Sequence, residues 1–168
     1  MSGSLQFIKS ATGSSVSSLS VTDCFSDKYD VYKIYIEGTT NSGEFWGDLN
    51  FIDSGGVDTT SNYDQATLHT RADSAFNEYR ATSITKFERF GLYGLEGGST
   101  IFQCFNPFDS SSFTFFTMQN STVDTTPSNV GKGAKSIGVH TVAEQITGIQ
   151  IAGGTYAQVD VKVYGVKG

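Results

Sequence analysis

The sequence is poor in cysteine, histidine and charged residues. It contains two Cys, two His and 17% charged residues, where an average protein has about a quarter of its residues charged. Two cysteines are too few for a disulfide-rich scaffold, and no Cys or His spacing such as CxxC or HExxH predicts a metal site. Because Lys, Arg and Glu are scarce, the chain also has few good helix formers.

Long apolar runs and basic clusters are missing as well. No apolar stretch approaches the roughly 20 residues that cross a membrane, and the segment from Met1 to Phe7 lacks the basic and apolar regions of a signal peptide. The net charge of −6 disfavours binding to nucleic acid or to an anionic membrane. Without a secretion signal, we expect Cys24 and Cys104 to be two reduced, buried thiols.

Aromatic and glycine residues, by contrast, are abundant. The chain has 13 Phe, eight Tyr and 19 Gly, and its hydrophobic content of 38% argues against disorder. The clearest strand covers 157–164, where small apolar residues at 157, 159, 161 and 163 alternate with polar or amphipathic ones. A second apolar run, Ile146 to Ile151, precedes it, and Gly153 and Gly154 between the two predict a closing β-hairpin.

Similar patterns predict about ten strands in one domain, 1–168. Tyr32, Ile34 and Ile36 share one face of a strand over 31–37, which we expect to form a hairpin with a strand over 45–52. The other segments predicted as strands are 5–9, 16–21, 63–70, 75–83, 84–93, 100–105, 113–118 and 134–142. Their short, even spacing is typical of an all-β, antiparallel β-sandwich of jelly-roll-like form.

Three connecting or terminal segments complete this prediction. Residues 10–15 are interpreted as a flexible Gly/Ser turn, and Asn120 to Lys132 as a long, exposed polar loop. The Ser/Thr-rich residues 1–22 are either the first strands of the domain or an N-terminal arm that docks on a neighbouring subunit.

No group of residues predicts a catalytic centre, a metal site or a cofactor site. There is no GxSxG nucleophile motif and no phosphate-binding glycine loop. We expect His69 and His140 to be strand or loop residues without a catalytic task. Asp23, Asp27 and Asp30 lack the EF-hand pattern and are interpreted as a solvated acidic turn. The protein is therefore expected not to be an enzyme.

Two functional alternatives depend on other side chains. In a receptor- or glycan-binding module, aromatic loop residues such as Trp46 or Tyr63 would stack on sugar rings. In a small hydrolase that acts on surface polysaccharide, carboxylates such as Asp58, Asp64 or Glu96 would flank the scissile bond.

Four short segments carry a family resemblance: Ser4–Lys9, Tyr29–Ile34, Ser61–Tyr63 and Val161–Lys167. Together they resemble virion structural proteins of marine tailed phages, such as cyanophages. In those proteins a D-x-Y-K strand, here starting at Asp30, and a closing hydrophobic-Tyr-Gly-hydrophobic-Lys segment frame a compact β-domain. The resemblance implies a β-sandwich on the particle surface, either a capsid decoration (knob) protein or part of a tail fibre, without catalytic residues.

The resemblance also implies a location and a set of partners. The protein would belong to the virion, assembled in the host cytoplasm, and would contact the major capsid protein or other virion proteins. A host surface glycan is the further partner in the receptor-binding alternative. Because no coiled-coil or repetitive shaft precedes the domain, the head surface is favoured over a fibre. Low charge and many aromatics suit symmetric packing, so we expect a homotrimer, with Phe113, Phe115 and Phe116 in core and subunit contacts.

Overall fold

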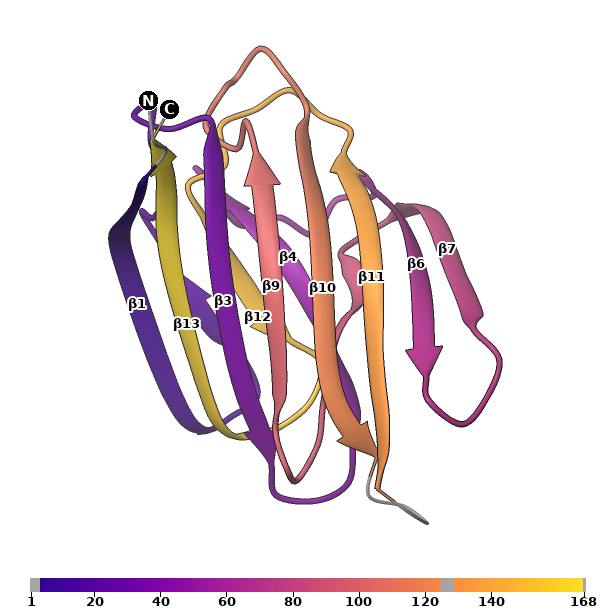
Figure 1. Cartoon of the computed structure of the whole chain (residues 1–168). Helices are drawn as coiled ribbons and strands as arrows, with labels where there is room; N and C mark the ends of the chain where they lie inside the picture. Colours follow the sequence, from indigo (N-terminus) through magenta and orange to yellow (C-terminus); the bar gives the residue numbers. More distant parts are fainter. Residues whose placement is uncertain (1–3, 125–128, 168) are drawn as a thin grey trace.

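The computed structural model of the chain describes residues 4–124 and 129–167, and their strands form two antiparallel sheets packed face to face (Figure 1). In spatial order, the eight-stranded sheet contains β1 (Ser4–Val16), β13 (Tyr156–Lys167), β3 (Val31–Thr40), β9 (Gly98–Phe105), β10 (Thr114–Asp124), β11 (Val130–His140), β6 (Tyr63–Arg71) and β7 (Asn77–Ile84). The second sheet contains β2 (Leu19–Val21), β12 (Gly148–Ala152), β4 (Phe45–Asp53) and β5 (Gly56–Val57), with β8 (Phe87–Tyr93) paired to β4.

The expected antiparallel β-sandwich is confirmed, with thirteen strands in the described part of the chain rather than about ten. The chain passes repeatedly from one sheet to the other: β1 and β3 lie in the eight-stranded sheet, whereas β2 and β4 lie in the second. Ser4 pairs with Lys167, so the two ends of the described chain lie side by side (Figure 1). The described residues contain no helix long and apolar enough to cross a membrane.

Alternating side chains build the core between the two sheets, as the sequence predicts. In β3, Tyr32, Ile34 and Ile36 are fully buried, while the residues between them face outward. Val159, Val161 and Val163 form the buried face of β13. Each such side chain contributes about 1.5–3 kcal/mol by its removal from water. The pattern therefore identifies correctly which face of each of these strands is buried.

Aromatic rings fill the centre of this core. Phe116 of β10 packs edge-on against Phe87 of β8, with ring centroids 4.4 Å apart, and Phe102 of β9 packs against Phe90 of β8 at 5.0 Å. These contacts join strands of different sheets, and edge-to-face pairs add about 0.5–1.5 kcal/mol beyond burial. The many phenylalanines of the sequence thus hold the two sheets together.

Both predicted hairpins are wrong, because the chain changes sheets at each of these turns. β3 pairs with β13 and β9, whereas β4 pairs with β12, β5 and β8. In the same way β12 pairs with β2 and β4, but β13 pairs with β1 and β3.

Gly153 shows why the second glycine turn is not a hairpin. Its φ is +110°, and a Cβ at this position would lie 2.6 Å from the carbonyl oxygen of Trp46. The glycine therefore lets the connection pass tightly over the backbone of β4 on its way to the other sheet.

Two segments predicted as irregular are strands instead. Residues 10–15 continue β1, which pairs with β13 from Ser4 to Val16 with one register shift after Phe7. Most of the predicted loop from Asn120 to Lys132 belongs to β10 and β11, which pair as far as Asp124 and Val130, while residues 125–128 lie outside the described residues. These segments are rich in polar side chains because β1 is an edge strand and because β10 and β11 have an exposed face. Their polarity does not indicate irregular structure.

The two cysteines are reduced and buried, as expected. Burial raises the pKa of the Cys24 thiol to about 12, and burial, with the neighbouring Cys24, raises the pKa of Cys104 well above its usual value. Both thiols act as small core side chains.

Candidate functional site

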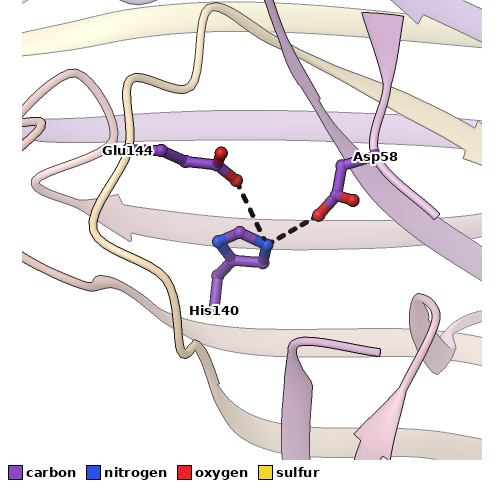
Figure 2. Close-up of side chains that lie close together, drawn as sticks. All are labelled: Asp58, His140 and Glu144. Atoms are coloured by element: carbon purple, nitrogen blue, oxygen red, sulfur yellow. Dashed lines mark hydrogen bonds and ion pairs between the residues drawn. The ribbon is translucent and has the colours of Figure 1, made fainter. Parts of the chain in front are cut away.

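Three ionisable side chains meet where β11 ends: Asp58, from a distant part of the sequence, and His140 and Glu144, which are four residues apart (Figure 2). The Nε2 atom of His140 lies 2.7 Å from Oδ2 of Asp58 and 3.6 Å from Oε1 of Glu144. One donor atom from each residue lies within 4.8 Å of the others. We call this group the Asp58–His140–Glu144 cluster. It is the only group of three His, Cys, Asp or Glu side chains with this spacing in the described part of the chain.

The second sheet and its adjoining loop fix the position of Asp58. Its Oδ1 atom accepts hydrogen bonds from the backbone N–H and the hydroxyl of Thr60, at 2.8 and 2.6 Å. Its backbone carbonyl accepts hydrogen bonds from the Asn50 amide and the Tyr63 hydroxyl. With Oδ1 occupied by Thr60, Oδ2 is directed at His140, as Figure 2 shows.

His140, the last residue of β11, is fully buried between aromatic rings. Its imidazole packs edge-on against Tyr63 at 4.8 Å and Phe51 at 5.7 Å. Nδ1 has no hydrogen-bond partner among the described residues. Since Asp58 is an acceptor, Nε2 of His140 carries a proton.

Glu144 lies in the connection that leads from β11 to β12, and its side chain is partly exposed. The connection is held on both sides of Glu144, because the Thr141 N–H donates to Asn62 O and the Ile146 N–H to Pro107 O. Burial raises the pKa of the Glu144 carboxyl, and the negative charges of Asp53 and Asp58 add to this effect while His140 opposes it.

The pKa of the Asp58 carboxyl is shifted in the opposite direction, downward. Burial alone raises the pKa of Asp58, but the hydrogen bonds from Thr60 and His140 outweigh burial and lower the pKa overall. Asp58 is therefore a carboxylate at neutral pH. The cluster combines one imidazole with two carboxyl groups. Of its three members, Glu144 is the one that is partly exposed to solvent.

The other histidine, His69, lies in a separate open hollow of about 180 Å³. Trp46 stacks on its ring with centroids 4.5 Å apart, and Glu44, Asn77 and Lys132 also line the hollow. Burial and the positive charge of Arg89 lower the pKa of His69, so the imidazole is neutral at pH 7. The hollow thus offers an aromatic surface beside polar side chains.

The third candidate is the face of the eight-stranded sheet that points away from the second sheet, here called the outer face. Side chains on this face form an apolar row across six strands. The row lies at the end of the sheet where β1 begins and β13 ends. Register pairs connect Leu5 with Val166, and Val31 with Phe105, Phe115 and Val139. Further exposed apolar residues lie on the same face, Phe7 and Ile137 beside the row and Ile101 further along β9.

The outer face is also nearly free of net charge. On its five central strands, β13, β3, β9, β10 and β11, the outward-facing charged residues are Lys33, Lys135 and Lys162 against Glu37 and Asp160, a net charge of +1. The whole chain carries −6. The negative charge of the protein is therefore concentrated away from these strands.

Several side chains singled out in the sequence lie elsewhere. Tyr63, predicted to be an aromatic loop residue, starts β6 and is fully buried, so its proposed stacking on sugar is wrong. Asp64 accepts a hydrogen bond from the Ser83 backbone, and Glu96 is exposed between β8 and β9. Asp58, Asp64 and Glu96 therefore do not form one site.

The acidic turn and the three phenylalanines are also located by the structure. Asp23, Asp27 and Asp30 are exposed in the connection between β2 and β3, as predicted for a solvated turn. Phe116 belongs to the core, whereas Phe113 and Phe115 are exposed. The meeting of Asp58 with His140, 82 residues later, had no signal in the sequence. Neither the protein-family models nor the curated proteins with which the sequence was compared match it.

Proposed function

We propose that this protein is a non-catalytic structural component of a virus particle, in which copies of the chain pack together through the outer face of the eight-stranded sheet. The observation that carries the proposal is the apolar row, with Phe115 45% exposed and Ile137 beside it 62% exposed. Exposed apolar patches of this kind mark interaction surfaces in soluble proteins. The aromatic side chains in it are those enriched at subunit interfaces.

The partner that fits this face best is another copy of the same chain. Elsewhere the protein is acidic, so most surfaces of two copies repel each other, whereas the outer face carries a net charge of +1 on its central strands. Contact of this face with the more acidic surface of a neighbouring copy is electrostatically favourable. A head-to-tail contact forms a closed ring when the rotation between neighbouring copies permits it, and we propose a homotrimer.

The resemblance of four segments to virion structural proteins of marine tailed phages supports a place on the particle. Within the virion, a capsid decoration protein in contact with the major capsid protein is favoured over a tail-fibre domain. The edge of the trimer not used for self-contact would then bind the capsid lattice.

Mass spectrometry of purified phage particles tests this function. The proposal predicts that the protein copurifies with particles through a density gradient, in a fixed ratio to the major capsid protein. Detection of the protein in the infected-cell lysate but not in the particles would contradict it.

A glycan-binding module is the second candidate, because Trp46 and His69 present a stacked aromatic surface in an open hollow. At about 180 Å³ the hollow is smaller than most ligand pockets and would suit a single sugar ring. Trp46 is the only tryptophan, so its fluorescence reports on this hollow directly. Saturable fluorescence change on titration with simple hexoses, lost in Asn77→Ala, would favour this candidate. No change would count against it.

A further inference from the structure

We propose that Asp58, His140 and Glu144 form a binding site for a divalent transition-metal ion, with zinc the best match to their chemistry. This inference is independent of the role of the outer face. It depends on three donor atoms, from the loop after β5, the end of β11 and the connection that follows β11, which lie within 4.8 Å of one another (Figure 2).

The three donor atoms lie close enough together for one ion to bind between them. A tetrahedral zinc site with bonds of about 2.0–2.1 Å places its ligand atoms about 3.3 Å apart. The Nε2 atom of His140 lies 2.7 Å from Asp58 and 3.6 Å from Glu144, which brackets this value. A bound ion would lengthen the 2.7 Å separation between His140 and Asp58 and draw the three donor atoms, now within 4.8 Å of one another, together around it.

The ligand set selects the type of metal. Imidazole suits zinc and its neighbours in the first transition row, whereas calcium and magnesium prefer sites made of oxygen atoms alone. Three protein ligands leave a fourth position for water, and the partly exposed Glu144 provides the side from which an ion and its water enter. The two carboxylates balance the charge of the ion.

Hydrogen bonds from neighbouring residues orient Asp58 well as a ligand, but they orient His140 less well. Thr60 holds Oδ1 of Asp58, so that Oδ2 points to the site. Metal binding at Nε2 transfers the imidazole proton to Nδ1, which has no hydrogen-bond partner among the described residues. Loss of such an outer contact typically lowers metal affinity about 10–100-fold. We therefore expect zinc to bind about 10–100-fold more weakly here than at a site in which the Nδ1 proton is hydrogen-bonded.

The bound ion would connect three parts of the fold. His140 ends β11 in the eight-stranded sheet, Asp58 follows β5 in the second sheet, and Glu144 lies in the connection between the sheets. The ion would thus fasten the two sheets at one end of the sandwich. Binding to the folded state alone raises the unfolding temperature by about 5–10 °C at a hundredfold excess over the dissociation constant.

The test is titration of the chelator-treated full-length protein with Zn²⁺ by calorimetry, with thermal unfolding in parallel. Glu144→Gln removes one ligand from a partly exposed position without opening the core, and Glu96→Gln is the matched control in an exposed turn. We expect one ion per chain in the wild type and in Glu96→Gln, and at least tenfold weaker binding in Glu144→Gln.

Co²⁺ gives a second measurement, because tetrahedral coordination produces intense visible absorption. This band should appear in the wild type and in His69→Gln, and should need at least tenfold more Co²⁺ to appear in Glu144→Gln. Absence of saturable binding, equal affinity of Glu144→Gln and wild type, or a preference for Ca²⁺ over Zn²⁺ would each overturn the proposal.

Discussion

Phe115 and Phe116 are neighbours in β10, but they point to opposite faces of the eight-stranded sheet. Phe116 is 2% exposed and contacts the rings of Phe87, Phe90 and Phe102. Phe115 is 45% exposed and lies in the apolar row of the outer face. The comparison separates two uses of the same residue type: inward aromatics hold the sheets together, and outward ones are available to a partner.

Removal of the inward ring should give the largest effect. We expect Phe116→Ala to lower the free energy of unfolding by about 3–5 kcal/mol, because it leaves a cavity among three other rings. Phe115→Ala should change it by no more than about 0.5 kcal/mol under conditions where the protein is monomeric. Urea unfolding followed by circular dichroism measures both. Equal losses in the two variants would contradict the division between the faces.

A methyl group added against the inward ring should have a smaller effect. A Cβ at Gly138 of β11 would lie 2.1 Å from a ring carbon of Phe116, so Gly138→Ala forces the ring to shift and should cost about 1–3 kcal/mol. Gly131, in the same strand, has no atom within 4 Å of such a Cβ, and Gly131→Ala is the control. Thermal unfolding of both variants compares them. A Gly138→Ala variant as stable as Gly131→Ala would show that the core around Phe116 is looser than described.

The reactivity of cysteine thiols also distinguishes the buried core from the outer face. Burial raises the pKa of Cys24 to about 12 and that of Cys104 above its usual value, so neither thiol forms appreciable thiolate at pH 8. Under conditions where the protein is monomeric, a cysteine placed on the outer face by Thr117→Cys should react with a disulfide reagent about 10³-fold faster than either natural thiol. In urea all three should react alike. Rapid labelling of the wild-type protein at pH 8 would contradict the burial of its thiols.

The sequence predicts the strands well, but it predicts their pairing poorly. Alternation at Tyr32, Ile34 and Ile36 identifies the buried face of β3 because side chains in a strand point to opposite sides. The same pattern does not say which strand lies alongside, and adjacency in the chain suggested hairpins at Gly43 and Gly153. The structure instead uses Gly153 for a close crossing over Trp46.

The candidate site was beyond sequence reasoning for a similar physical reason. Asp58 and His140 are 82 residues apart, and each alone is an ordinary strand-end or loop residue. Their meeting depends on β5 in one sheet lying near the end of β11 in the other, which is a consequence of packing rather than of local pattern. The burial of Tyr63 was missed although Tyr63 starts the predicted strand 63–70, because the polar residues on both sides of it do not indicate a buried face.

The measurement that tests the central claim most directly is the native mass, by light scattering, of the wild type and of a Phe115→Ser/Ile137→Ser variant. Phe76→Ser, which removes an aromatic side chain that is 66% exposed between β6 and β7, is the matched control. We predict three times the chain mass of 18.1 kDa for the wild type and for Phe76→Ser, and a single chain mass for the double variant. A wild-type monomer at high concentration, or a trimer in the double variant, would contradict assembly through the outer face.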